Sequence, residues 1–286
     1  RGVGVSADAD NNTTVNNYTK NQADETFADV KVLSFYISDE IALTDSLDLV
    51  LGARFDKMDV DVSGGGPVSD SDETISPKAG LIFDVTDAIS VYASYSETFT
   101  PKAKDQYAKL EKNADKTDPD TFENTEFGLR YDLPVGLSLS AAYFEIEKNA
   151  PTYVDALTTT MSTSEISGFE VQLSGNLTSR WFISAGYTNL DAHASDGDRL
   201  RETPENVFSI WNNFTVSDRL ALNLGIINQG ESYIKEGGTQ KLPDYTRVDA
   251  GASYALSENT SIQLNIENLT DELYFPHAHG NHQASV

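Results

Sequence analysis

The sequence predicts an all-β protein, a transmembrane antiparallel β-barrel with about 12 strands present in the chain. Two observations lead to this fold class. Six times along the chain, two hydrophobic runs of alternating pattern meet at a short polar turn. The remaining connections between runs are long and polar. Short turns at one end and long loops at the other are typical of barrels that cross a membrane.

All six short turns open on an apolar residue, and in five of them a second apolar residue closes the turn. Four of the turns have an aromatic residue two positions before their first residue. Residues two apart on a strand share a face, so each ring lies beside the apolar residue that opens its turn. An apolar face that ends in aromatics suits a strand that crosses a bilayer. The turns are residues 43–47, 85–89, 133–137, 177–181, 216–220 and 256–260, and the aromatics are Phe83, Tyr131, Phe214 and Tyr254.

Strands are expected on both sides of every short turn. In residues 47–56 one face carries apolar residues and the other carries mostly charged or small ones, which gives one face for lipid and one for a hydrated lumen. The apolar face is Leu47, Leu49, Leu51, Ala53 and Phe55, and the other face includes Asp48, Gly52, Arg54 and Asp56. The alternation breaks at residues 143–144 and 208–211, where we expect β-bulges. The predicted strands are residues 28–43, 47–62, 74–86, 89–99, 122–133, 137–149, 162–177, 181–193, 203–216, 220–230, 243–256 and 260–271.

The long connections separate this pattern from a β-propeller, the main structural competitor. A four-stranded blade needs three tight turns per repeat, whereas each repeat here has one short turn and one long loop. Short turns lie on the periplasmic side of such barrels and long loops lie outside the cell. We therefore expect residues 1–26, which are polar and lack a core pattern, to form an extracellular loop segment, and residues 27–286 to form the barrel.

Composition excludes several classes of function. The formal net charge of −25 argues against nucleic acid as a partner, because phosphate binding needs clustered Lys and Arg. The chain has no cysteine, so no disulfide framework or thiolate metal site is expected. No nucleophile elbow or glycine-rich phosphate loop is present, and an enzyme is not expected.

The direction of the strands indicates an incomplete barrel. If the short turns are periplasmic, the first strand runs downward and the last runs upward, so both chain ends lie outside the cell. A protein inserted from the periplasm does not ordinarily end there. The sequence is therefore interpreted as the C-terminal part of a larger barrel that lacks at least its final strand.

Six stretches stand out in order along the chain: residues 91–101 (VYASYSETFTP), 122–132 (FENTEFGLRYD), 166–170 (ISGFE), 203–206 (TPEN), 242–249 (LPDYTRVD) and 265–274 (NIENLTDELY). Together they resemble TonB-dependent outer-membrane receptors, particularly siderophore receptors. Asp105-Gln106-Tyr107, followed by the second stretch, is similar to receptors for catecholate siderophores. The resemblance implies a barrel of 22 strands around an N-terminal plug, of which this chain supplies strands 10–21.

The same resemblance implies a function. The expected activity is import of a ferric siderophore, with TonB acting through the plug. The expected partners are outer-membrane lipid, lipopolysaccharide and the iron chelate, around a monomeric barrel without a resident cofactor. Another ligand, such as cobalamin, haem or an oligosaccharide, stays open. A passive porin-like barrel or an adhesive surface barrel is the alternative from a different class.

Basic and aromatic residues in the long loops are the candidates for contact with an anionic, aromatic ferric catecholate. The loop after residue 100 concentrates five lysines in a strongly acidic chain, although acidic residues are interleaved and a solvated mixed-charge loop stays open. Two arginines follow in a later loop, and a tyrosine and a lysine in the next. The candidates are Lys102, Lys104, Gln106, Tyr107, Arg199, Arg201, Tyr233 and Lys235.

Three of the four histidines lie close together near the end of the chain, at His277, His279 and His282. Imidazoles at this spacing suit a borderline transition metal if the loop folds around it. His277 and His279 are also candidates for ligand contact, where the rings donate hydrogen bonds or respond to acid pH. A polar extracellular loop without a metal is the third interpretation.

Overall fold

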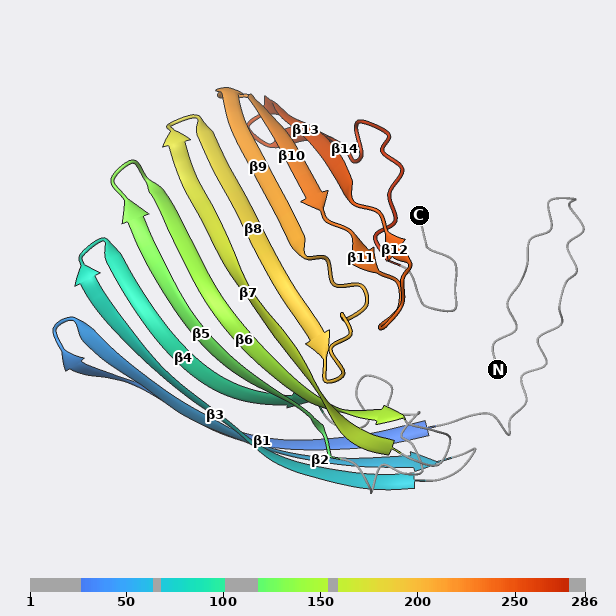
Figure 1. Ribbon diagram of the computed structural model, residues 1–286. Helices are drawn as coiled ribbons and strands as arrows, with labels where there is room; N and C mark the ends of the chain where they lie inside the picture. The colour runs from blue at the N-terminus through green and yellow to red at the C-terminus, as the bar shows by residue number, and fades with distance from the viewer. Residues whose placement is uncertain (1–26, 64–67, 101–117, 154–158, 278–286) are drawn as a thin grey trace, which may run out of the picture.

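The computed structural model describes residues 27–63, 68–100, 118–153 and 159–277. Twelve of its strands form one antiparallel sheet in the order of the chain, with β1 and β14 at the two edges. Figure 1 shows this sheet as a curved wall, with the short turns along one rim and the connections of residues 195–205 and 230–244 toward the other. No helix in the described part of the chain is long and apolar enough to span a membrane. The predicted all-β fold is confirmed.

All twelve predicted strands are present in the sheet. Their bounds are β1 (Phe27–Thr44), β2 (Leu47–Ser63), β3 (Val68–Thr86), β4 (Ile89–Thr100), β5 (Asp120–Leu133), β6 (Leu137–Tyr153), β7 (Thr159–Thr178), β8 (Trp181–Ala194), β9 (Asn206–Ser217), β10 (Leu220–Gln229), β13 (Tyr245–Ser257) and β14 (Thr260–Ile266). A two-stranded hairpin, β11 (Ser232–Tyr233) and β12 (Lys241–Leu242), lies within a connection that was predicted as loop alone.

The strand ends differ from the prediction where polar residues pair beyond the apolar run. Strand β3 begins six residues earlier than expected, at Val68. There the Ser69 and Ser71 hydroxyls donate hydrogen bonds to Asp61 (2.6 Å) and Asp59 (2.7 Å) on β2. Cross-strand hydrogen bonds of this kind extend a hairpin without any hydrophobic pattern. Conversely, β14 ends at Ile266 rather than at residue 271.

The two predicted bulges are wrong. Strand β6 pairs through Tyr143 and Phe144 without a register shift, and β9 pairs through residues 208–211 in the same way. The extra ring on the inner face is accommodated by a glycine on the neighbouring strand. Trp211 lies over Gly225, where an added Cβ would come within 2.6 Å of the indole, and Phe144 lies beside Gly168. The aromatic residue therefore breaks the hydrophobic pattern without breaking the strand.

The register shifts occur instead at the short turns. In five of the six turns, the apolar residue that opens the turn is passed over in the strand pairing. The hydroxyl of the next residue then accepts the backbone N–H two positions further on, at 3.2–3.3 Å. The sixth turn has Pro134 at that place and closes through Gly136, whose φ of 84° favours glycine. The five passed-over residues are Leu43, Val85, Leu177, Val216 and Leu256.

Removing one turn hydroxyl is expected to weaken its hairpin slightly. Thr86 accepts the N–H groups of Ala88 and Ile89, so Thr86→Val leaves both without that partner. We expect a loss of about 0.5–1 kcal/mol in the free energy of unfolding, because water replaces an exposed hydrogen bond. Denaturant titration of the refolded receptor measures this loss. Thr86→Ser keeps the hydroxyl and serves as control, and an equal loss in both variants would contradict the role of the hydroxyl.

The outer surface of the wall changes from apolar to acidic along the strands. A row of outward-facing aromatics crosses β5 to β9, with Phe127 opposite Tyr143, Tyr143 opposite Phe169, and the Phe169 and Tyr187 rings 5.7 Å apart. Beyond this row, glutamates face outward on four neighbouring strands. Amphipathic rings prefer the membrane interface, so this row marks where the lipid-facing surface ends. The four glutamates are Glu97, Glu123, Glu147 and Glu165.

Candidate functional site

Two connections at the looped end of the wall pack against each other. The first is residues 195–205, between β8 and β9; the second is residues 230–244, between β10 and β13, which contains β11 and β12. The Glu202 N–H donates to the Tyr233 carbonyl at 2.8 Å. Gly237, at a φ of 63°, lies so close to Asp198 that an added Cβ would meet the carboxylate at 2.2 Å. The structure therefore brings the candidates Arg199 and Arg201 beside the candidates Tyr233 and Lys235.

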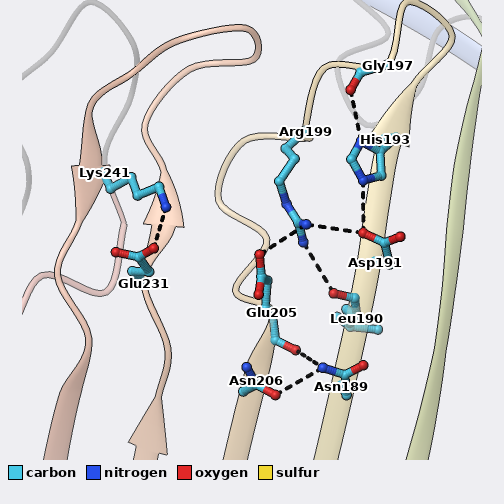
Figure 2. A network of polar contacts seen from close by, with 10 residues as sticks. All are labelled: Asn189, Leu190, Asp191, His193, Gly197, Arg199, Glu205, Asn206, Glu231 and Lys241. Atoms are coloured by element: carbon cyan, nitrogen blue, oxygen red, sulfur yellow. Dashed lines mark hydrogen bonds and ion pairs between the residues drawn. The ribbon is translucent and has the colours of Figure 1, made fainter.

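Arg199 is occupied by the protein itself. Its guanidinium lies 3.1 Å from the Asp191 carboxylate and 3.0 Å from that of Glu205, and its side chain is only 24% exposed. It also donates to the Leu190 carbonyl at 3.4 Å. Figure 2 shows how these contacts tie the loop to the ends of β8 and β9. Such paired contacts position a loop, so the Arg199 guanidinium already has partners within the protein, and its contact with a ligand stays a prediction.

The second loop has its own ion pair. Lys241 pairs with the Glu231 carboxylate (Figure 2), and its ammonium lies 4.6 Å from the centre of the Tyr233 ring. The hydrogen bond and the charge of Glu231 raise the pKa of Lys241 above its ordinary value. Lys241 at the start of β12 is thereby joined to Glu231 and Tyr233 at β11, and these contacts hold the two short strands together. The candidate Tyr233 is consequently part of a cation–π contact within the loop.

Arg201 and Lys235 remain as exposed cations on these two loops. Neither forms an ion pair with another side chain in the described part of the chain. Arg201 uses its carbonyl to accept the Thr203 hydroxyl, and Lys235 uses its carbonyl to accept the Gly238 N–H. Their charged ends are therefore open to solvent, in a chain with a net charge of −25. Exposed cations of this kind attract anions, and the contact of Arg201 and Lys235 with a ligand stays a prediction.

The other candidates fall largely outside the described residues. That is the case for Lys102, Lys104, Gln106 and Tyr107, and for His279 and His282. His277 is described and exposed. Within the described ranges no group of three His, Cys, Asp or Glu side chains could hold a metal ion, and the proposed metal site of the three histidines stays a prediction.

One polar network on the inner wall was missed by sequence reasoning. Asp249, 5% exposed, accepts the Arg247 guanidinium at 2.8 Å and the Asn268 N–H at 2.8 Å. Arg247 also donates to the Tyr274 hydroxyl at 3.3 Å, and the Tyr274 ring stacks on Tyr245 at 4.7 Å. The signal was present, because residues 242–249 and 265–274 were both recognised as motifs. Only the structure shows that the two motifs contact each other and so fasten the segment after β14 to β13.

The fold and the looped end define a class of protein. Residues 2–269 match the family model described as TonB dependent receptor-like, beta-barrel. This chain therefore belongs to the TonB-dependent receptor β-barrel family, and it is an outer-membrane protein of a Gram-negative bacterium. The orientation follows, with the short turns periplasmic and the looped end extracellular.

Several of the individual relatives are receptors named for siderophores. The chain is 29% identical over 290 residues to the probable TonB-dependent siderophore receptor PiuA of Acinetobacter baumannii, covering 90% of this chain and 39% of the relative. It is 26% identical over 239 residues to the catecholate siderophore receptor Fiu of Escherichia coli, covering 74% of this chain and 31% of the relative. The chain thus spans well under half the length of these curated relatives.

Solved structures agree with the fold. The crystal structure of the siderophore receptor PiuA from Acinetobacter baumannii superposes with a TM-score of 0.83 at 29% identity, over 91% of this chain and 42% of that one. The ferripyoverdine receptor of Pseudomonas aeruginosa bound to ferripyoverdine superposes with a TM-score of 0.74 at 26% identity, over 90% and 37%. The sheet described above therefore corresponds to part of the barrel wall in receptors of this family.

Proposed function

We propose that this chain forms part of the wall and extracellular mouth of a receptor that imports a ferric siderophore across the outer membrane. The observation that carries the proposal is the family match over residues 2–269, together with relatives that are siderophore receptors. The wall acts as scaffold and the extracellular loops capture the ligand. No bond is made or broken in this role, and the iron chelate is cargo rather than a resident cofactor.

The chemistry of the looped end supports an anionic ligand. Arg201 and Lys235 lie on loops that contact each other, while Arg199 and Lys241 are neutralised by carboxylates. Ferric catecholates are anionic and aromatic, and exposed cations at the mouth attract them against the acidic background of the chain. Catecholate specificity is accordingly the ligand class that we propose.

The remaining partners follow from the proposal. Energy reaches the receptor from TonB through a plug domain outside this chain. Lipid and lipopolysaccharide surround the outward aromatic row of β5–β9. A single barrel is a complete transport unit in this scheme, so a monomer is sufficient.

The test uses the intact receptor expressed in a receptor-deficient strain and purified for binding measurements. We expect Arg201→Gln with Lys235→Gln to weaken binding of a ferric catecholate about tenfold, since each lost charge contributes about 0.5–1 kcal/mol at an exposed site. The loss is expected to shrink at high salt. Isothermal titration or fluorescence quenching measures the affinity, and growth on a panel of iron chelates identifies the class.

The matched control removes the same charge at the other rim. Arg180→Gln with Arg219→Gln changes two exposed arginines in periplasmic short turns and is expected to leave affinity unchanged. Equal weakening by both pairs would show a general charge effect and would remove the two loops as the capture site. Growth on no chelate in the panel would defeat the siderophore assignment itself.

A further inference from the structure

His193 is the second-to-last residue of β8, and its ring lies between two hydrogen-bond acceptors. Its Nδ1 is 3.0 Å from the Gly197 carbonyl oxygen, and its Nε2 is 2.8 Å from the Asp191 carboxylate (Figure 2). A backbone carbonyl and a carboxylate offer only lone pairs at neutral pH. A neutral imidazole has one N–H and one lone pair, so it satisfies only one of the two contacts. The doubly protonated ring satisfies both.

The charged groups around the ring suit this cation. Glu165 on β7 is the direct cross-strand partner of His193, and Asp191 on β8 contacts the ring. Arg199 in the loop is the partner of His193 in an isolated backbone β-bridge. The side chains of both residues contact the same Asp191 carboxylate oxygen. Glu205, the last residue before β9, contacts the same Nη1 atom of Arg199 that pairs with Asp191. Three carboxylates therefore face two cations when the ring is charged, and Asp196 and Asp198 follow in the loop.

The Gly197 contact closes a tight turn. The Gly197 N–H donates to the Ala194 carbonyl at 2.9 Å, and the Ala194 N–H donates to the Asp198 carbonyl at 2.8 Å. His193 reaches across this turn and fixes its tip to the Asp191 side chain. Because Asp198 in the same turn lies against Gly237, the position of the tip also sets the contact with the 230–244 loop.

We propose that His193 is an acid-dependent latch, which holds residues 195–205 against the end of β8 while its ring carries two protons. When the ring loses one proton, either the Gly197 contact or the Asp191 contact is lost. Acid pH favours the doubly protonated ring that both acceptors require, so the latch is complete on the acid side and opens as the pH rises. The latch concerns the loop itself and holds whether or not the cargo is an iron chelate.

Hydrogen exchange of the intact receptor in detergent tests the latch. Amides of residues 194–200 are followed by mass spectrometry at about pH 5.5 and about pH 8, with rates corrected for the intrinsic effect of pH on exchange. We expect protection in this segment to fall about two- to fivefold at the higher pH, the loss of one partly exposed hydrogen bond. Protection in the short periplasmic turns is expected to stay constant.

His193→Gln is the decisive variant, because it keeps the other three histidines and the length of a polar side chain. An amide group cannot donate to two acceptors on opposite sides as the imidazolium does. We expect this variant to show low protection in residues 194–200 at both pH values. Constant protection in the unmodified receptor, or the same pH dependence in His193→Gln, would overturn the proposal.

Discussion

Asp249→Ala is expected to lower the free energy of unfolding by about 2–4 kcal/mol, because it removes one partner of a largely buried ion pair. The carboxylate accepts Arg247 and the Asn268 N–H, and the side chains of Asp249 and Arg247 are 7% and 23% exposed. The variant leaves a guanidinium with the Tyr274 hydroxyl as its remaining side-chain contact, and an amide without its acceptor. Asn268 has a φ of 52°, a left-handed conformation that asparagine adopts more readily than most residues.

A double-mutant cycle separates the ion pair from the packing. Denaturant titrations compare Asp249→Leu, Arg247→Leu and the variant that carries both substitutions. Replacing both partners by apolar residues is expected to cost less than the sum of the two single changes, since no charge is left without its partner. Asp249→Asn retains an oxygen for the Asn268 N–H and is expected to lose less than Asp249→Ala. Strict additivity in the cycle would contradict the role of the pair.

Gly168→Ala is expected to destabilise the wall by about 1–3 kcal/mol through overpacking. Gly168 lies on β7 where β8 approaches, and an added Cβ would be 2.2 Å from the Asn189 carbonyl oxygen. A backbone oxygen cannot rotate away as a side chain can, so the two strands must separate. The same methyl group would also come within 3.2 Å of the Phe144 ring on the other side.

Gly186→Ala provides the matched control on the neighbouring strand. An added Cβ at Gly186 meets only the Ser209 hydroxyl, at 3.6 Å, which is ordinary van der Waals contact. We expect this variant to unfold at nearly the same denaturant concentration as the unmodified receptor. If both glycines tolerated alanine equally, the close approach at Gly168 would not be a constraint on the wall.

The strands and turns were predictable because they depend on local pattern. Alternation along Leu47, Leu49 and Leu51 reports one lipid-facing side, and each short turn opens on an apolar residue at the end of a hydrophobic run. The two predicted bulges are wrong because the pattern within a single strand shows Phe144 and Trp211 only as apolar residues on the polar face. The glycines that receive these rings, Gly168 and Gly225, lie on neighbouring strands, and nothing in the local pattern connects them.

The candidate site was predicted less completely, because the role of a charge depends on its neighbours. Arg199 and Arg201 look equivalent in the sequence, yet Arg199 is neutralised by Asp191 and Glu205 while Arg201 stays exposed. His193 belongs to no motif, so nothing in the local sequence assigns it a role. Its importance comes from the Gly197 carbonyl and the Asp191 carboxylate on its two sides.

The sequence by itself determined the class of fold, the order and number of the long strands, the rim of short turns and the receptor family. These properties follow from periodic hydrophobicity and local motifs, which are written into consecutive residues. Only the tertiary structure decided which cations are open to a ligand, which glycines receive a ring and which histidine faces two acceptors. Each of these depends on strand register and loop contact, which place side chains from distant parts of the chain within a few ångströms of one another.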